Sequence, residues 1–343
     1  MTLVRYFLCL SVITSHYFIL NGIPNILCNG GDMRIGVFFA MSGYLIYASY
    51  ERNNDTKKYF KNRLTRILPT YLTVIISTAI LLSLLSSLTL SEYFSSGHFW
   101  KYLTCNAIFL NFLCPTLPGV FDTGNILPAV NGALWTLKVE WTFYIFIPIF
   151  FWIIRHVKCS SKVLSAVICI ISVAYVFIMR DIYISTGNKL YYILSYQFFG
   201  QGIYFFSGVL IYHFRKYVSG KKSILPLLSS IVFYILFLFI DGIHSEWSET
   251  LMYSIVPPII SVLMLSFSLG ENMCDFQRYL GNYSYEMYLL HFPILQTLIN
   301  MGVTTSLHPL CGLAVTFILT FLAAVAVSKT VGMFKKRIFS TVP

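Results

Sequence analysis

Long apolar runs are the feature that most restricts the fold of this chain. They recur along its 343 residues at positions 68–88, 141–154, 224–240 and 310–327. A helix needs about 20 apolar residues to cross a hydrocarbon core, where its backbone polar groups must be satisfied internally. The charged fraction of 11% agrees with this pattern, since soluble domains carry about a quarter charged residues. The runs therefore predict an all-α, polytopic membrane protein.

The net charge of +11 is explained by topology and does not indicate nucleic-acid binding. If about ten helices cross the membrane with both termini cytoplasmic, most of the 24 basic residues fall in segments expected inside, as the positive-inside rule requires. We therefore predict a single membrane-embedded domain over residues 1–343 in a bacterial cytoplasmic (inner) membrane. The basic residues expected outside are Arg34, Lys101, Lys138, Arg180 and Lys189.

Some segments are not expected to cross. Residues 100–113 are apolar but too short, which predicts a re-entrant or interfacial segment. Residues 114–133 contain three prolines and three glycines and predict a long irregular loop of the kind that often has a function. The basic stretch 51–66 predicts an inside loop, after which Pro69 would occupy the first turn of the next helix.

The remaining expected spans follow from the apolar runs between these segments. Pro257 and Pro258 predict a kink in one of them. We expect spans at residues 35–50, 69–90, from 136 onward, 163–179, 195–214, 223–241, 250–269 and 283–301. A tenth span, after residue 301, leads into a basic tail.

The opening segment, residues 3–20, places two ionisable side chains in apolar surroundings. Arg5 and His16 are eleven positions apart, so on one helix they lie roughly 20° apart in direction with ~16 Å of rise between them. Ionisable groups at membrane depth usually face a protein interior or a water-filled path. A signal peptide is the alternative, but His16 stands where its apolar region should be and no small-residue cleavage site follows.

Three further groups could carry chemistry, and each also has a plainer explanation. Arg63 and Arg66, one helical turn apart, could grip one anionic group, or serve topology alone. Trp135 and Glu140 lie at the outer end of an expected span, where an aromatic belt or snorkelling would also place them. His291 is expected at mid-membrane depth, where a histidine can also bridge helices by a hydrogen bond.

The eight cysteines show no paired spacing. They include no C-x-x-C motif and no dense framework, so they read as small core residues. We expect neither a disulfide scaffold nor a bound metal.

Together, the motifs resemble one family. The stretches R(x10)H, FFAMSGYLI, RLTRILP, WTLKVE and LGNYSYEMYLLHFP occur here in the order and spacing of the membrane-bound acyltransferase family 3. The chain is most similar to the members that O-acetylate cell-surface polysaccharide, such as lipopolysaccharide O-antigen. It departs from many members at Gly36 and Val37, where they carry an acidic residue before the FF pair.

The resemblance implies an O-acyltransferase that takes acetyl from cytoplasmic acetyl-CoA and needs no metal. The acceptor would be a glycan or lipid-linked glycan: O-antigen, capsule or exopolysaccharide. Arg5, Arg63 and Arg66 would bind the donor at the inner face. His16 would act as general base on a sugar hydroxyl, or carry the acetyl group covalently. The motifs assign further roles: Glu140 and His291 would orient His16 or the acceptor, and Ser42, Trp135 and Tyr285 would contact substrate.

A transporter or flippase for a lipid-linked sugar is the competing interpretation. In such a protein the intramembrane arginine and histidine would line a translocation path. Transporters more often show paired broken helices in corresponding halves, and this sequence has no such symmetry. Transfer of acetyl from acetyl-CoA to polysaccharide would distinguish the two.

Overall fold

The structure is a computed structural model that describes residues 2–24, 31–122, 125–218, 232, 258–266 and 283–340. The regular elements in these ranges are all helices, which confirms the all-α class for the described part. Four helical segments within it are long and apolar enough to cross a membrane: residues Thr56–Leu85, Gly132–Val157, Ser161–Thr186 and Pro309–Lys335. The expected total of about ten spans and the cytoplasmic placement of both termini stay predictions.

The chain divides into two compact units. Unit 1 comprises Met1–Leu8, Asn29–Phe60 and Val139–Gln277, and unit 2 comprises Cys9–Cys28, Lys61–Lys138 and Arg278–Pro343. Three helices contribute residues to both units: α1 (Thr2–Leu20), α3 (Thr56–Leu81) and α6 (Trp135–Val157).

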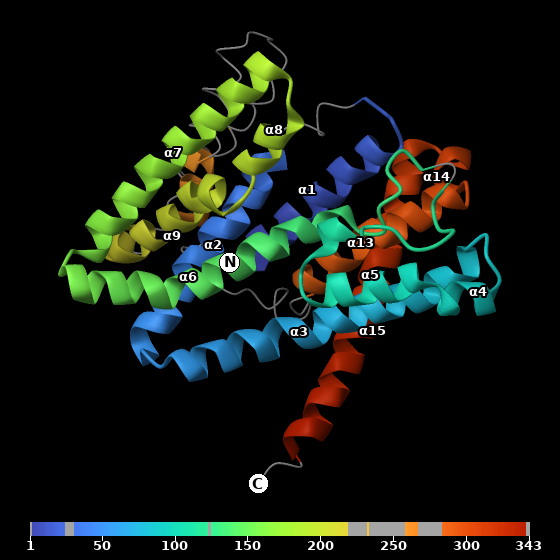
Figure 1. Ribbon diagram of the computed structural model, residues 1–343, viewed down its shortest axis with the longest axis horizontal. Helices are drawn as coiled ribbons and strands as arrows, with labels where there is room; N and C mark the ends of the chain where they lie inside the picture. Colours follow the sequence, from blue (N-terminus) through green and yellow to red (C-terminus); the bar gives the residue numbers. More distant parts are fainter. Residues whose placement is uncertain are drawn as a thin grey trace. The chain divides into compact units, whose positions relative to one another are not determined.

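Unit 1 is built on close packing between α2 (Gly31–Asn53), α7 (Ser161–Thr186) and α9 (Phe198–Val218) (Figure 1). A Cβ atom at Gly43 would lie 1.9 Å from the carbonyl oxygen of Phe205. One at Gly208 would lie 2.0 Å from that of Ala40. Small residues let membrane helices approach backbone to backbone, so Gly43 and Gly208 allow α2 and α9 to pack closely.

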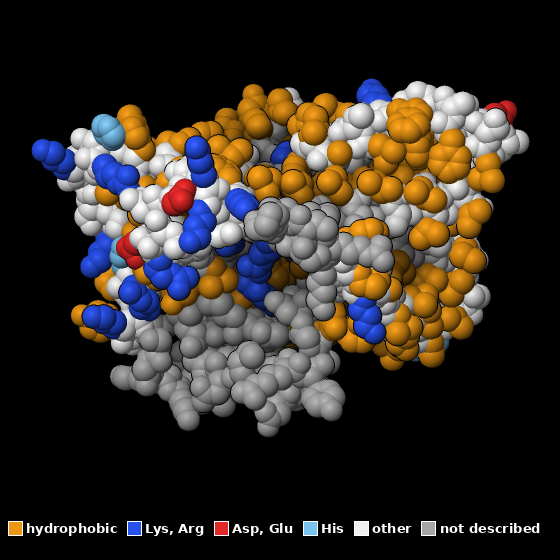
Figure 2. All heavy atoms as spheres, turned by 90° about the horizontal axis from the view of Figure 1, so that it is seen from below, with side chains coloured by type: hydrophobic (Ala, Val, Ile, Leu, Met, Phe, Trp, Pro, Cys, Tyr) orange, Lys and Arg blue, Asp and Glu red, His pale blue; other side chains and the backbone are white. Residues whose placement is uncertain are grey.

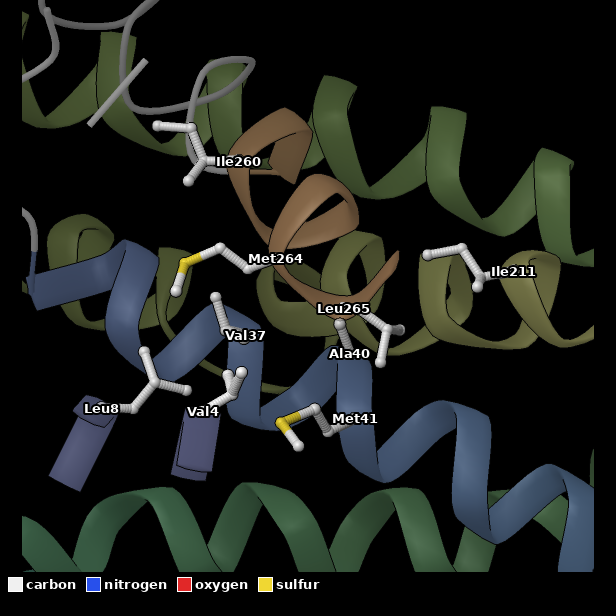
Figure 3. Packing of buried hydrophobic residues seen from close by; sticks show 9 residues of the cluster. All are labelled: Val4, Leu8, Val37, Ala40, Met41, Ile211, Ile260, Met264 and Leu265. Carbon is white, nitrogen blue, oxygen red and sulfur yellow. The ribbon is translucent and has the colours of Figure 1, made fainter. Parts of the chain in front are cut away.

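The apolar core of unit 1 joins segments that are far apart in the sequence (Figure 3). Val4 and Leu8 of α1 pack with α2, with α9 and with the helical stretch 258–266. The cluster consists of Val4, Leu8, Val37, Ala40, Met41, Ile211, Ile260, Met264 and Leu265.

Unit 2 contains α13 (Ser284–Asn300), α14 (Val303–Ser306) and α15 (Pro309–Ser340), with α13 packed along α15. An apolar cluster in unit 2 joins the end of α1 to α13 through Tyr17, Phe18 and Phe292. A Cβ atom at Gly312 would lie 2.3 Å from the hydroxyl of Tyr17. The glycine therefore makes room for α15 beside α1.

The segments expected not to cross consist of short elements of unit 2, and their interfacial or re-entrant placement stays a prediction. Two short helices, α4 (Leu90–Ser95) and α5 (Gly97–Ala107), cover the interfacial stretch, followed by the turn η3 (Asn111–Leu113). The loop up to η4 (Gly132–Leu134) has no helix or strand in its described residues.

The expected basic loop at residues 51–66 is wrong. The helix α2 runs through Asn53 and α3 begins at Thr56, leaving only a tight turn at Asn54, whose φ is +48°. Asp55 starts α3, because its carboxylate accepts a hydrogen bond from the backbone N–H of Lys58 at 3.0 Å, as helix-capping residues do. Pro69 consequently lies inside α3 and not in its first turn.

Proline also lies inside α6 and α13. In both helices a side chain donates a hydrogen bond to the backbone carbonyl that proline leaves without a backbone donor. Pro148 would otherwise bond the carbonyl of Tyr144, which instead accepts from the Tyr59 hydroxyl at 3.2 Å. Pro293 leaves the carbonyl of Leu289, which accepts from an asparagine of the preceding loop, as described below. Such substitution is how membrane helices tolerate proline.

The surface is apolar along the candidate spans. Exposed hydrophobic side chains follow one another along α7 at helical spacing: Val163, Val167, Ile170, Ile171 and Ile178. Figure 2 shows hydrophobic side chains over much of one face, with lysine and arginine side chains gathered in one part of it. Apolar surface of this extent indicates contact with lipid, and we conclude that this is a membrane protein.

Helices cover most of the other expected spans in the described part, and α15 runs through much of the basic tail. The expected span at residues 69–90 is too long, because α3 ends at Leu81 and the separate helix α4 begins at Leu90. Membrane crossing by α2, α9 and α13 stays a prediction. The expected spans at residues 223–241 and 250–269, with the kink at Pro257 and Pro258, lie wholly or mostly outside the described residues. The single-domain prediction for residues 1–343 also stays a prediction.

Candidate active site

Two histidines from distant parts of the sequence meet in unit 2. His16 lies near the C-terminal end of α1, and His291 lies in the middle of α13. Their rings stack with centroids 5.1 Å apart and an interplanar angle of 8°. Nδ1 of His16 is 2.9 Å from Nε2 of His291, which is a hydrogen bond. His291 is fully buried, whereas His16 is half-buried.

The surroundings of His291 determine which nitrogens carry protons. Its Nδ1 lies 2.7 Å from the backbone carbonyl of Tyr288, and a carbonyl can only accept, so Nδ1 carries the proton. In the neutral imidazole Nε2 is then the acceptor. His16 must therefore donate from Nδ1, and with both rings neutral the lone pair of His16 is on Nε2. The pair thus selects a tautomer of His16 with a basic Nε2.

The helix that carries His291 is fixed by the segment that leads into α6. Asn131 donates from its side chain to the Leu289 carbonyl at 2.8 Å, the group that Pro293 leaves without a backbone partner. The hydroxyl of Thr136 lies 2.8 Å from that of Tyr288. Both contacts stand within two or three residues of His291, so this segment determines where its imidazole lies.

A glutamine one turn further along α13 holds the loop itself. Gln296 is fully buried, and its amide nitrogen donates to the carbonyls of Leu127 and Ala129, the latter at 2.8 Å. Its carbonyl oxygen accepts from the side chain of Asn125 at 2.9 Å. Buried amides satisfied in this way fix the backbone that they contact. The loop that was expected to form a functional mouth is thereby attached to the helix of His291.

Glu140 belongs to a separate cluster in unit 1. Its Oε1 accepts from the Ser42 hydroxyl at 2.9 Å and from the Tyr144 hydroxyl at 2.5 Å. Tyr144 follows one helical turn later on α6, while Ser42 comes from α2. The structure therefore brings together two of the predicted site residues, Glu140 and Ser42.

The other predicted residues lie on helices as expected. Arg5 is half-buried on α1, and α1 is helical over the whole interval from Arg5 to His16. Arg63 is half-buried and Arg66 exposed, one turn apart on α3. Trp135 begins α6 and is half-buried.

Tyr285, the last of the predicted residues, lies in the first turn of α13. Its hydroxyl is 3.5 Å from the carbonyl of Ile67 in α3. This contact lies within unit 2, two residues before Pro69 in the RLTRILP stretch.

Among the residues that the structure describes, three buried arginine or glutamate side chains were missed by the sequence analysis. Arg34 on α2 is 2% exposed, Arg180 on α7 is 8% exposed and Glu286 on α13 is 9% exposed. Arg34 and Arg180 were assigned to outside segments because a charged residue at the edge of an apolar run was interpreted as the end of the membrane span. Their nearness to the apolar run was the signal available, since charges at such positions usually pack inside the protein.

No group of three or more histidine, cysteine, aspartate or glutamate side chains is placed to hold a metal ion within the described ranges.

Comparison with known proteins gives one consistent family. The family described as the acyltransferase domain matches residues 1–329. An O-acetyl transferase of Shigella phage Sf6 is 25% identical over 301 residues, which make up 86% of this chain and 84% of that protein. YrhL of Bacillus subtilis (strain 168), named as a peptidoglycan O-acetyltransferase, is 25% identical over 322 residues, or 85% of this chain and 47% of that protein.

No solved structure matches the chain. The family match nevertheless spans almost the whole sequence, and relatives named as O-acetyltransferases align over most of it. The chain belongs to the acyltransferase family to which its ordered motifs pointed, and it is an O-acyltransferase of the membrane.

Proposed function

We propose that this protein transfers an acetyl group from cytoplasmic acetyl-CoA to a sugar hydroxyl of a cell-surface polysaccharide, in the bacterial cytoplasmic membrane. The observation that carries the proposal is the hydrogen bond between His16 and His291. A half-buried imidazole with an assigned tautomer is what a general base or acyl carrier requires. Relatives named for O-acetyl transfer support the acetyl group and the polysaccharide acceptor.

In the direct route, Nε2 of His16 takes the proton of the sugar hydroxyl while the oxygen attacks the acetyl carbonyl carbon. A C–O bond forms and a tetrahedral oxyanion results. The C–S bond then breaks, and the leaving thiolate of coenzyme A takes the proton from the His16 imidazolium. His291 holds the His16 ring through Nδ1 and stabilises the imidazolium, as the partner of a catalytic histidine does.

In the covalent route, Nε2 of His16 itself attacks the thioester carbonyl and coenzyme A leaves as the thiolate. The resulting acetyl-imidazolium retains a proton on Nδ1, which faces the acceptor atom Nε2 of His291. The sugar oxygen then attacks the acetyl group, losing its proton to the thiolate or to water, and His16 is regenerated. Both routes need the same tautomer.

The arginines are proposed to bind the donor. Coenzyme A carries phosphates, and arginine binds phosphate through two parallel hydrogen bonds. Arg63 and Arg66 are one turn apart on α3, the spacing at which two side chains can reach one anion. Arg5 would join them near the inner end of α1.

The acceptor is proposed to contact Ser42, Trp135 and Tyr285, with Glu140 as a polar anchor. Glu140 Oε1 already accepts from Ser42 and Tyr144, so within unit 1 the carboxylate holds Ser42 in place. A sugar hydroxyl could donate to the second carboxylate oxygen, since an ionised carboxylate accepts several hydrogen bonds.

The test is transfer of radiolabelled acetyl from acetyl-CoA to de-O-acetylated surface polysaccharide by the full chain in nanodiscs. We expect the wild-type protein to label the polymer and His16→Ala to label it roughly 10²- to 10⁴-fold more slowly. The variant must remain inserted and monodisperse. Full activity of His16→Ala would remove the catalytic assignment.

The two routes can be separated with the same material. Rapid quench in neutral denaturant in the presence of labelled acetyl-CoA, without polysaccharide, should trap label on the protein only if the covalent route operates. His16→Ala is the matched control, because it removes the acylated atom. Label retained by that variant would contradict an acyl-histidine at this position.

A further inference from the structure

A group of tyrosines surrounds a buried arginine at one end of unit 1. Arg180 lies near the end of α7 and donates to the Tyr196 hydroxyl at 3.0 Å. Its guanidinium also lies over two rings, 5.5 Å from the centroid of Tyr192 and 5.4 Å from that of Tyr196. The ring of Tyr183 packs against Tyr192 at 5.2 Å. We call Arg180, Tyr183, Tyr192 and Tyr196 the tyrosine platform.

Local sequence fixes the platform in one position. The helix α7 ends at Gly187, which takes the left-handed conformation with φ +65°. Asn188 then caps the short helix α8 (Lys189–Ser195) by accepting from the backbone N–H of Leu190 at 3.0 Å. At the other end of α8, a Cβ atom at Gly200 would lie 1.7 Å from the carbonyl oxygen of Ser195. The turn and the close contact leave little freedom for α8.

The hydroxyl groups form a chain that begins at the arginine. Tyr196 accepts from Arg180, and its oxygen lies 3.0 Å from that of Tyr192. The orientation we assign directs the Tyr196 hydrogen away from the guanidinium and toward Tyr192. The hydrogen of Tyr192 then points outward, and the buried cation polarises the chain in that direction.

The platform presents two features that can bind a sugar ring: an exposed aromatic face and hydrogen-bond donors. Tyr192 is 39% exposed, and Lys189, one turn before it on α8, is also exposed. The negative face of an aromatic ring attracts positively polarised C–H groups, which line one face of a sugar. An outward O–H and a nearby ammonium donate to hydroxyl or carboxylate oxygens, which sugars also carry.

We propose that the tyrosine platform binds a sugar unit of the glycan acceptor other than the one that is acetylated. This inference rests on the proposed function, and it follows the sequence-based expectation that Arg180 and Lys189 lie on the outer side. A tyrosine belt that merely contacts lipid headgroups is the other source of exposed tyrosines at a membrane boundary. The mutually tilted rings held around Arg180 and the hydroxyl chain anchored on it favour a specific ligand.

The experiment measures binding of fluorescein-labelled, de-O-acetylated surface polysaccharide to the full chain in phosphatidylcholine nanodiscs. We expect Tyr192→Ala to weaken binding about two- to tenfold, the range of one aromatic contact. Tyr192→Phe keeps the ring and loses the hydroxyl, so it should fall between Tyr192→Ala and wild type. Tyr217→Ala is the matched control, because Tyr217 is 81% exposed near the other end of α9.

Steady-state kinetics give a second measurement. Tyr192→Ala should raise KM for the polymer by the same factor and leave kcat and the KM for acetyl-CoA unchanged. A single monosaccharide acceptor should show no difference, since it has no second sugar unit for the platform to bind. Tyr192→Phe is the fallback where Tyr192→Ala does not stay monodisperse.

Unchanged polymer affinity in Tyr192→Ala would overturn the platform. A second result would also overturn it: Tyr192→Ala changes the stability of the protein in phosphatidylglycerol nanodiscs but does not change polysaccharide binding. Lipid would then be the ligand. If wild-type protein transfers acetyl but Tyr192→Ala binds the polymer as tightly as wild type, the platform fails and the proposed function stands. If it binds polymer through Tyr192 but transfers nothing, the proposed function fails.

Discussion

Two polar clusters inside apolar helices use their hydrogen bonds in opposite ways. In unit 1, Glu140 receives two hydroxyl donors on one oxygen, from Ser42 and Tyr144. In unit 2, His16 gives a proton to His291 and retains a basic nitrogen, because His291 is itself oriented by the Tyr288 carbonyl. The carboxylate accepts from hydroxyl groups of its own protein, whereas the tautomer of His16 places its lone pair on Nε2, where the proposed reaction takes up a proton. Under the proposed function, the direction of donation, more than burial, separates the supporting group from the reactive one.

The largest expected effect comes from His16→Asn. Asparagine places an amide N–H near the position of Nδ1, so the bond to His291 can persist while the basic Nε2 is lost. We expect acetyl transfer to fall roughly 10²- to 10⁴-fold with the melting temperature close to wild type. Radiolabelled transfer and thermal unfolding in nanodiscs measure the two. Wild-type activity in this variant would show that transfer does not need the basic Nε2 of His16 and would contradict the comparison of the two clusters.

His291→Ala should have the next largest effect. It removes the acceptor that sets the His16 tautomer, and we expect roughly 100-fold slower transfer, below the loss seen when a triad carboxylate is altered. His291→Gln can still offer an oxygen near the position of Nε2 and should recover part of the rate. Equal losses in both variants would show that His291 acts through packing alone.

Glu140→Gln tests the supporting cluster. The amide oxygen can still accept from Ser42 and Tyr144, but without the negative charge these bonds lose about half their strength. We expect up to about a tenfold loss of kcat over KM for the polysaccharide, with KM for acetyl-CoA unchanged. A loss as large as that of His16→Asn would place Glu140 in the reaction itself and erase the distinction drawn above.

Ser42→Ala should have the smallest effect. It deletes one of two donors to Glu140 Oε1, a hydrogen bond to a charged group worth about 1.5–3 kcal/mol at most, and Tyr144 remains. We expect a lowering of the melting temperature and less than about a threefold change in transfer. Thr at the same position is the control, since it keeps the hydroxyl. The change should appear in the KM for the polysaccharide, and an unchanged KM would contradict the proposed contact between Ser42 and the acceptor.

Much of the helical layout could be predicted from the sequence because the apolar runs leave helices as the answer. The boundary at residues 51–66 could not, since basic composition indicates the inner face but not whether the backbone there is helical. The capping role of Asp55 was readable in principle. A run of charged residues concealed it, because such a run was interpreted as a loop.

The candidate site was predicted as residues and not as contacts. The sequence could place His16 and His291 at membrane depth, and orientation of His16 by a partner was anticipated for His291 and Glu140 alike. It could not show that His291 makes the contact, since 275 positions separate the two histidines. Buried Arg34 and Arg180 escaped because charge counting assigns every basic residue to a surface.

The attachment of the long loop to α13 has a consequence for re-engineering the acceptor. Gln296 binds the backbone carbonyls of Leu127 and Ala129, not their side chains, so the side chains of that loop can be exchanged while its path is retained. A loop transplanted from a relative would still meet the amide of Gln296, which stays on α13, but it must supply an asparagine for the Leu289 carbonyl. Chimeras whose loop lacks that asparagine should misplace His291, and those that keep it should remain active.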